Sequence, residues 1–133
     1  MSLSKHIFDR LKSHAAVSAL VSTRIYPVRF PKDAAKPLIT DQVQDGYRYS
    51  TVSTGMTKTS ATRVQFNCIA LTYGEAEEIK DAVADAFSGY ADTLHGEHIQ
   101  EVNLEVDTDD DFSETSDFYR RIAIFEFIHS RVA

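Results

Sequence analysis

The sequence feature that most constrains the fold is a stretch, Ala61 to Gly89, in which a strand pattern passes directly into a helix pattern. Between Arg63 and Leu71, polar and apolar residues alternate with a period of two, which is typical of a strand with one buried face. The inward face of this predicted strand consists of Val64, Phe66, Cys68 and Ala70. We expect Cys68, the one cysteine of the chain, to be a small buried side chain rather than a nucleophile or a ligand.

The predicted helix begins after Thr72, whose hydroxyl can cap it, and Glu75 can complete a capping box. Its apolar stripe recurs every four residues and consists of Ile79, Val83 and Phe87. Gly89 supplies the left-handed residue that commonly ends a helix. Neither element can bury its apolar face alone, so the rest of the chain must pack on this pair.

Further periodic segments lie on both sides of this unit. Residues 3–21 predict a helix hairpin or kinked helix, with an apolar stripe of Leu3, Ile7 and Leu11 and a second short segment that Ser13 can cap. Strands are predicted at Leu38 to Gln44, with Ile39 and Val43 on one face, at His98 to Val106 and at Phe118 to His129. The last strand is apolar on both faces, which indicates either a central position in the sheet or one face covered by a partner.

These elements predict an α+β fold in which two main helices pack on one face of an antiparallel or mixed sheet of about four strands. Residues 1–133 are expected to form a single domain. Within it, residues 45–60 are rich in Ser, Thr and Gly, so we expect a long exposed loop or a loose hairpin that is flexible. Asp107 to Glu114 is expected to be a turn.

Charge is unevenly distributed along the chain, whose net charge is −6. Residues 1–60 carry nine Lys or Arg against four Asp or Glu, whereas residues 61–133 carry five against sixteen. Such an acidic chain disfavours general nucleic-acid binding, because phosphate contacts need a basic face. The N-terminal segment is charged and no apolar run approaches membrane-spanning length, so neither a signal peptide nor a membrane partner is expected.

Motifs for catalysis or metal binding are weak. His95 and His98 lie three residues apart beside Glu97, but no further Cys or His pair accompanies them. Asp107, Asp109 and Asp111 alternate like the start of a calcium loop, but the required Gly and Glu positions hold Phe112 and Phe118. The sequence has no phosphate-binding loop and no nucleophile elbow. We therefore expect no enzyme activity, no cofactor and no bound metal.

Several short signatures resemble the tail-completion or tail-terminator proteins of long-tailed bacteriophages and prophages. They are Arg24-Ile25-Tyr26-Pro27 after an N-terminal helix, Pro37-Leu38-Ile39, Thr72-Tyr73-Gly74-Glu75-Ala76 at a helix start, and Phe118-Tyr119-Arg120-Arg121 in the closing strand. The resemblance implies a virion assembly protein without catalytic activity. It implies a ring, typically of six subunits, that caps the head-proximal end of the tail tube, stops its polymerisation and docks with the head connector.

The resemblance also implies the partners and the location of the protein. The partners are further copies of the chain, the tail tube protein and the head–tail connector protein, while DNA only passes through the channel. The protein is expected in the host cytoplasm during assembly and then in the virion tail. The basic first half and acidic second half suit a head-to-tail contact between copies.

Candidate interface residues come from the Ser-, Thr- and Gly-rich segment 45–60, from the acidic side of the predicted strand His98 to Val106, and from the acidic turn after it. They are Tyr47, Arg48, Tyr49, Met56, Lys58, Glu101, Glu105, Asp109, Asp110 and Asp111. One hypothesis places Glu101, Glu105 and the acidic turn in the channel, where they repel passing DNA. Alternative functions are a head-closure or neck connector protein and, from another class, a regulatory domain that binds a small ligand. A metal-dependent enzyme that uses His95 and His98 is the least favoured.

Overall fold

A computed structural model gives the fold of the chain. It describes residues 2–22, 24–27, 37–51, 55–94, 97–113 and 118–131. The described helices are α1 (Ser2–Ser13), α2 (Ala15–Val21) and α3 (Tyr73–Phe87). The described strands are β1 (Ile25–Pro27), β2 (Leu38–Thr51), β3 (Gly55–Ala70), β4 (Asp92–Leu94), β5 (Glu97–Ser113) and β6 (Phe118–Arg131).

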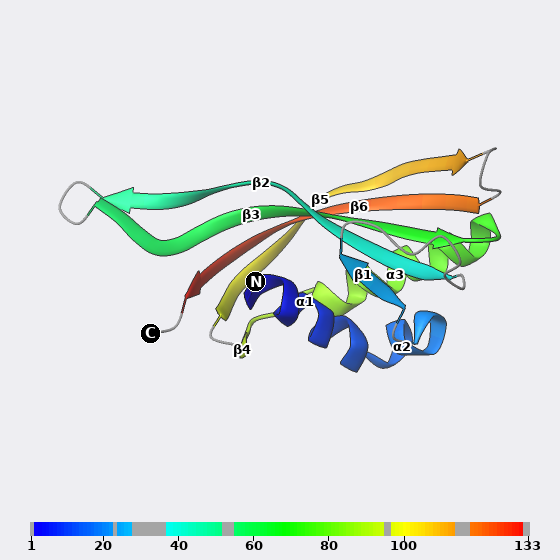
Figure 1. Cartoon of the computed structure of the whole chain (residues 1–133), viewed down its shortest axis with the longest axis horizontal. Coiled ribbons are helices and arrows are strands. Elements are labelled where there is room, and N and C mark those ends of the chain that lie inside the picture. The colour runs from blue at the N-terminus through cyan, green and yellow to red at the C-terminus, as the bar shows by residue number, and fades with distance from the viewer. Residues whose placement is uncertain are drawn as a thin grey trace.

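These strands form one sheet in the order β1-β2-β3-β6-β5-β4. The β1–β2 pair is parallel and the other pairs are antiparallel, so the sheet is mixed. Figure 1 shows the long strands crossing near the middle of the molecule, with all three helices on one side of the sheet. The predicted α+β class is confirmed, and the four long strands are joined by two strands of three residues that the sequence did not predict. As predicted, β6 is central, between β3 and β5.

The strand and helix that dominate the sequence are β3 and α3. The inward residues of β3 are buried, including Cys68, as predicted. The Thr72 hydroxyl accepts a hydrogen bond of 3.2 Å from the Glu75 backbone N–H, which confirms the predicted cap. Gly89 has a φ of +64°, so it ends the helical segment in the left-handed conformation as predicted.

Four phenylalanine rings fill the space between α3 and the sheet. The Phe66 ring lies 5.6 Å from both Phe87 and Phe125, and Phe87 lies 5.1 Å from Phe127. Each of these rings is at most 2% exposed. The rings join α3 to the two central strands β3 and β6, so this part of the core is filled.

The N-terminal helices pack against the end of α3. The predicted apolar stripe of α1, Leu3, Ile7 and Leu11, is buried. His6 Nε2 and the Tyr90 hydroxyl are hydrogen bonded at 2.7 Å, and Arg10 Nε donates to the Ala86 carbonyl at 2.8 Å. These contacts fix α1 against the C-terminal end of α3.

The predicted Ser13 cap of α2 is wrong. The N-cap residue is His14, which makes no side-chain cap hydrogen bond. Ser13 Oγ instead donates to the Arg10 carbonyl at 3.1 Å, inside the last turn of α1. Ser13 is the last residue of α1 and lies one position before the N-cap of α2, so its side chain is not placed to cap that helix.

Two segments predicted as loop or turn are strands. Of the two possibilities for residues 45–60, the structure has the hairpin, because 45–51 belong to β2 and 55–60 to β3. The predicted turn at Asp107 to Glu114 is wrong up to Ser113, since β5 continues to that residue. Both segments lack apolar periodicity, but each continues a hairpin whose ladder is already formed nearer the core.

Candidate assembly interface

The sheet has two edges that are only partly covered by described strands. On one edge, β1 pairs with β2 only at residues 39–41. On the other edge, β4 pairs with β5 only at residues 97–99. Among the described residues, Gln42–Thr51 of β2 and Gln100–Ser113 of β5 therefore have a paired strand on one side only. Rows of unpaired backbone N–H and C=O groups are templates for the addition of another strand.

The β2–β3 hairpin projects far from the helices, at the left of Figure 1. We call residues 45–51 and 55–60 the arm. Pairing of β3 with β6 begins at Thr59, so the outer part of the arm is a ribbon of two strands among the described residues. The predicted interface residues Tyr47, Arg48, Tyr49, Met56 and Lys58 all lie on this arm. Isolated two-stranded ribbons are marginally stable at best in water, so the arm is well suited to gain a third strand.

We call residues 100–113 of β5 the acidic edge. It contains the predicted interface residues Glu101, Glu105, Asp109, Asp110 and Asp111, together with Asp107. The ladder pairs position 110 with Arg121 and position 111 with Arg120, so two of these acidic positions have basic residues as their register partners. Glu101 is exposed. The two groups of predicted residues thus lie on opposite edges of the sheet and do not meet within one subunit.

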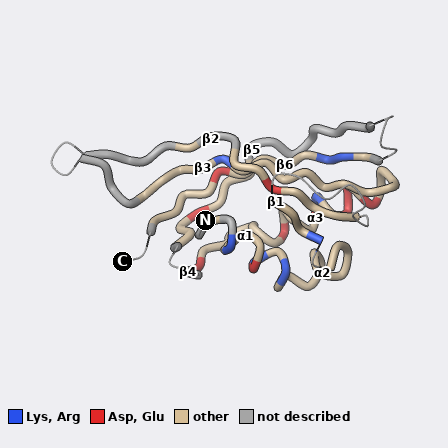
Figure 2. Tube along the Cα trace, in the orientation of Figure 1, with Lys and Arg blue, Asp and Glu red and all other residues tan. Residues whose placement is uncertain are grey.

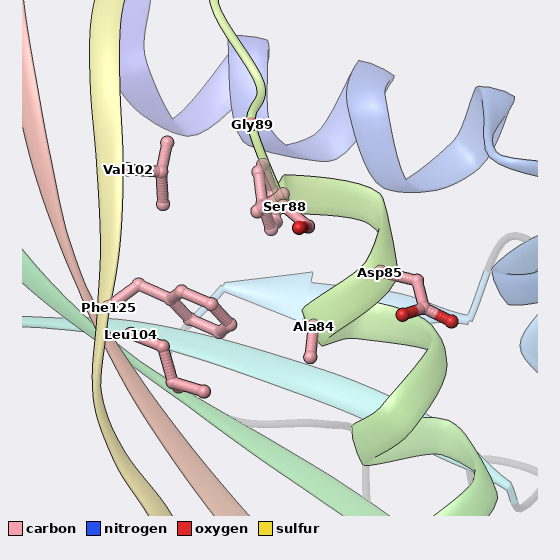
Figure 3. Close-up of a pocket in the computed structure, with 8 residues that line it drawn as sticks. Ala84, Asp85, Ser88, Gly89, Val102, Leu104 and Phe125 are labelled. Carbon is pink, nitrogen blue, oxygen red and sulfur yellow. The ribbon is translucent and has the colours of Figure 1, made fainter.

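A shallow groove lies beside the acidic edge. It has a volume of about 270 Å³ and separates the C-terminal end of α3 from β5 and β6. Figure 3 shows Val102, Leu104 and Phe125 on the sheet side, and Ala84, Asp85, Ser88 and Gly89 on the helix side. Leu104 is 43% exposed although the ladder places it opposite the core residue Phe125. The groove was not predicted from the sequence. The signal that could have located it is the alternation of Val102 and Leu104 with Glu101 and Asn103, which gives the apolar face of β5.

Val43 is exposed in the same way on the other edge. It is 47% exposed, although it pairs with the core residue Val64. The prediction that Ile39 and Val43 lie on one face is confirmed, because the ladder pairs them with the inward residues Cys68 and Val64, but of the two only Ile39 is buried. Each open edge thus carries one exposed large apolar side chain on the face that the helices cover elsewhere.

Charge is segregated within the helical layer. The helix α1 has three Lys or Arg and one Asp, and α3 has five Asp or Glu and one Lys, which Figure 2 marks in blue and red. Lys5 and Lys12 of α1 are exposed, and so are Glu77, Glu78 and Asp81 of α3. The helices therefore offer a second pair of surfaces with opposite charge, apart from the sheet edges.

The described residues that could do chemistry are few. Burial raises the pKa of the Cys68 thiol to about 12, so it stays protonated and unreactive near neutral pH. His98 is at the start of β5, while His95 lies outside the described residues. The described part of the chain contains no group of three His, Cys, Asp or Glu side chains arranged to hold a metal ion. Nor is any described helix long and apolar enough to cross a membrane.

The fold and its surfaces define a small α+β domain whose prominent exposed features are open strand edges and charged faces. A family model described as "Tail completion protein gp17" matches residues 5–130. The chain belongs to this family, and it is accordingly a phage tail structural protein. The resemblance noted in the sequence is confirmed.

A solved structure has the same fold. It is a chain of the structure described as "Virion of native gene transfer agent (GTA) particle", with a TM-score of 0.78 and 19% sequence identity. The match covers 93% of this chain and 91% of that one. Comparison with curated proteins finds no match.

Proposed function

We propose that the protein forms a homo-oligomeric ring, of six subunits as the family resemblance implies, that caps the head-proximal end of the phage tail tube. The cap ends polymerisation of the tube and provides the surface that joins the tail to the head connector. The observation that carries this proposal is the match to the tail completion family over residues 5–130. Catalysis has no part in this role.

The geometry supports an assembly role. The arm and the acidic edge are two different surfaces on opposite sides of one sheet. A contact between two different surfaces is heterologous, and copies joined by such a contact close into a ring when the rotation per subunit permits.

The alternative of a small-ligand regulatory domain gains little from the groove. Its polar lining side chains are only Asp85 and Ser88, at one rim, and the groove is open to solvent. Ligand sites usually bury most of the ligand and converge several polar groups on it.

Tail tube polymerisation in vitro tests the proposal. Purified tube protein is polymerised with and without this protein, and tube lengths and ends are examined by electron microscopy. We expect shorter tubes with a ring at one end only. Tubes of unchanged length with bare ends would reject the capping role. A ring that binds purified head connectors but not tubes would identify the neck alternative instead.

A further inference from the structure

We propose that neighbouring subunits are joined by strand addition, in which the arm of one copy pairs along the acidic edge of the next. This contact rests on the proposed homo-oligomeric ring and specifies the surfaces that close it. Both surfaces are strand edges with unpaired backbone groups among the described residues. Pairing them satisfies both rows of groups at once, and no described strand of the same chain pairs with either row.

Opposite charge matches the arm to the acidic edge. Apart from Asp45, the charged residues of the arm are the cations Arg48 and Lys58. The acidic edge has no Lys or Arg, and after Asp110 and Asp111 are set against Arg121 and Arg120 it still carries Glu101, Glu105, Asp107 and Asp109. An arm that meets another arm, or an edge that meets another edge, would bring like charges together. Charge therefore favours a head-to-tail contact over a symmetric one.

Exposed apolar residues mark the same two edges. The large apolar side chains that are exposed among the described residues are Val43, Leu71, Tyr73 and Leu104. Val43 lies in the open part of β2, two residues before the arm, and Leu104 lies in the open part of β5 beside the groove. A strand added to β5 extends the sheet past Leu104 and continues the floor of the groove shown in Figure 3. The contact would thus cover apolar surface as well as complete a ladder.

Charge reversal gives a test that only an arm-to-edge contact can pass. Two variants of the protein are made. The arm variant carries Arg48→Glu and Lys58→Glu. The edge variant carries Glu101→Lys, Glu105→Lys and Asp107→Lys. Each chain alone presents arm and edge of like sign, so we expect neither to form the wild-type ring. Mixed in equal amounts, the reversed arm meets the reversed edge and the native arm meets the native edge. We expect the mixture to regain the wild-type mass with the two chains in a 1:1 ratio.

A third chain is the matched control. It carries Glu77→Lys, Glu78→Lys and Asp81→Lys on the exposed face of α3, with the same change of charge as the edge variant. We expect it to assemble like the wild type. If it fails while the edge variant assembles, the contact belongs to the helical layer and the proposal is overturned. Circular dichroism and thermal melts establish that all three chains fold.

Mass is measured by light scattering and native mass spectrometry, on free protein and on caps formed at the ends of purified tail tubes. The arm-to-edge contact is overturned if either reversed variant assembles alone, or if the mixture of the two does not regain the wild-type mass. The capping role still holds in that case if wild-type rings cap tubes. A wild-type chain that stays monomeric both free and with tubes overturns both. The channel hypothesis predicts that reversal of Glu101 and Glu105 leaves ring assembly intact, so the edge variant separates these two roles.

Discussion

Asp41 should make the stability of this protein depend on pH in a direction unusual for a carboxylate. Asp41 is a residue of β2, and the ladder places it opposite Phe66 of β3 and Pro27 of β1. It is only 8% exposed. Removal from water disfavours the charged form and raises the pKa of Asp41 from 3.8 to about 6. Between these two values the folded chain holds a proton that the unfolded chain has lost.

The sign and size of the effect follow from this difference in proton binding. Because the folded state binds this proton more tightly, the contribution of Asp41 to the free energy of unfolding is greatest below pH 3.8. This contribution falls as the pH rises to about 6 and is constant above that. A shift of roughly two units corresponds to at most about 3 kcal/mol. Asp41→Asn removes the titration, so the variant should gain up to about 3 kcal/mol over the wild type between pH 4 and pH 7.

The assay is urea denaturation of both chains at a series of pH values and one protein concentration. Far-UV circular dichroism is the signal, because the chain has no tryptophan. The quantity of interest is the change with pH in the difference between the two free energies of unfolding, which cancels any constant effect of the amide. Asp81→Asn, at an exposed position of α3, is the control and should change stability by less than about 0.5 kcal/mol. If the free energies of unfolding of the wild type and Asp41→Asn differ by the same amount at pH 4 and pH 7, the raised pKa of Asp41 is refuted.

Three further predictions concern β3 and α3. Thr72→Ala should lower the free energy of unfolding by about 1 kcal/mol through loss of the cap, whereas Thr72→Ser should retain it, as chemical denaturation will measure. Gly89→Ala should cost about 1 kcal/mol because of its positive φ, while Gly74→Ala, which has open space around it, should be neutral or stabilising; equal effects in thermal melts would contradict this. Cys68 should resist Ellman's reagent at pH 8 in the native protein and react after unfolding in urea; rapid native labelling would show that the thiol is accessible.

The parts of the fold that the sequence predicted are those stabilised locally and by a buried face. The alternation in β3 and the four-residue period in α3 record burial against the same phenylalanine core, so both elements and their caps follow from residues 61–89. The strand β1 was not predicted because it has only three residues, the last of them Pro27, which are too few to show a period. Its parallel pairing with β2 is also a contact between segments that are not adjacent in the sequence. The Ser13 cap was wrong because α1 extends to Ser13 and the N-cap of α2 is His14, a boundary that the local sequence does not fix to one residue.

The candidate interface was predictable only as a list of residues. Composition singled out residues 45–60 and the acids from Glu101 onward, but only the strand order shows that they lie on opposite edges. The exposure of Val43 and Leu104 also depends on where the short edge strands and α3 end. The ends of these elements cannot be predicted from the local sequence of β2 or β5. Whether the arm is flexible in the free protein stays a prediction, and hydrogen exchange across residues 45–60 will test it.

Residues 45–60 and 107–113 lack apolar periodicity, and this has one physical explanation if they take part in the contact between subunits. Hydrophobic period records burial inside a chain, because apolar residues are placed where the chain covers its own surface. In the proposed contact these residues take part in backbone ladders that a neighbour completes, with specificity from charge, so they do not require an apolar stripe. A segment of this kind looks like a loop or a turn in a single sequence. On this reasoning, the reversals at Arg48, Lys58 and Asp107 should disturb assembly although the sequence predicted no strand at these positions.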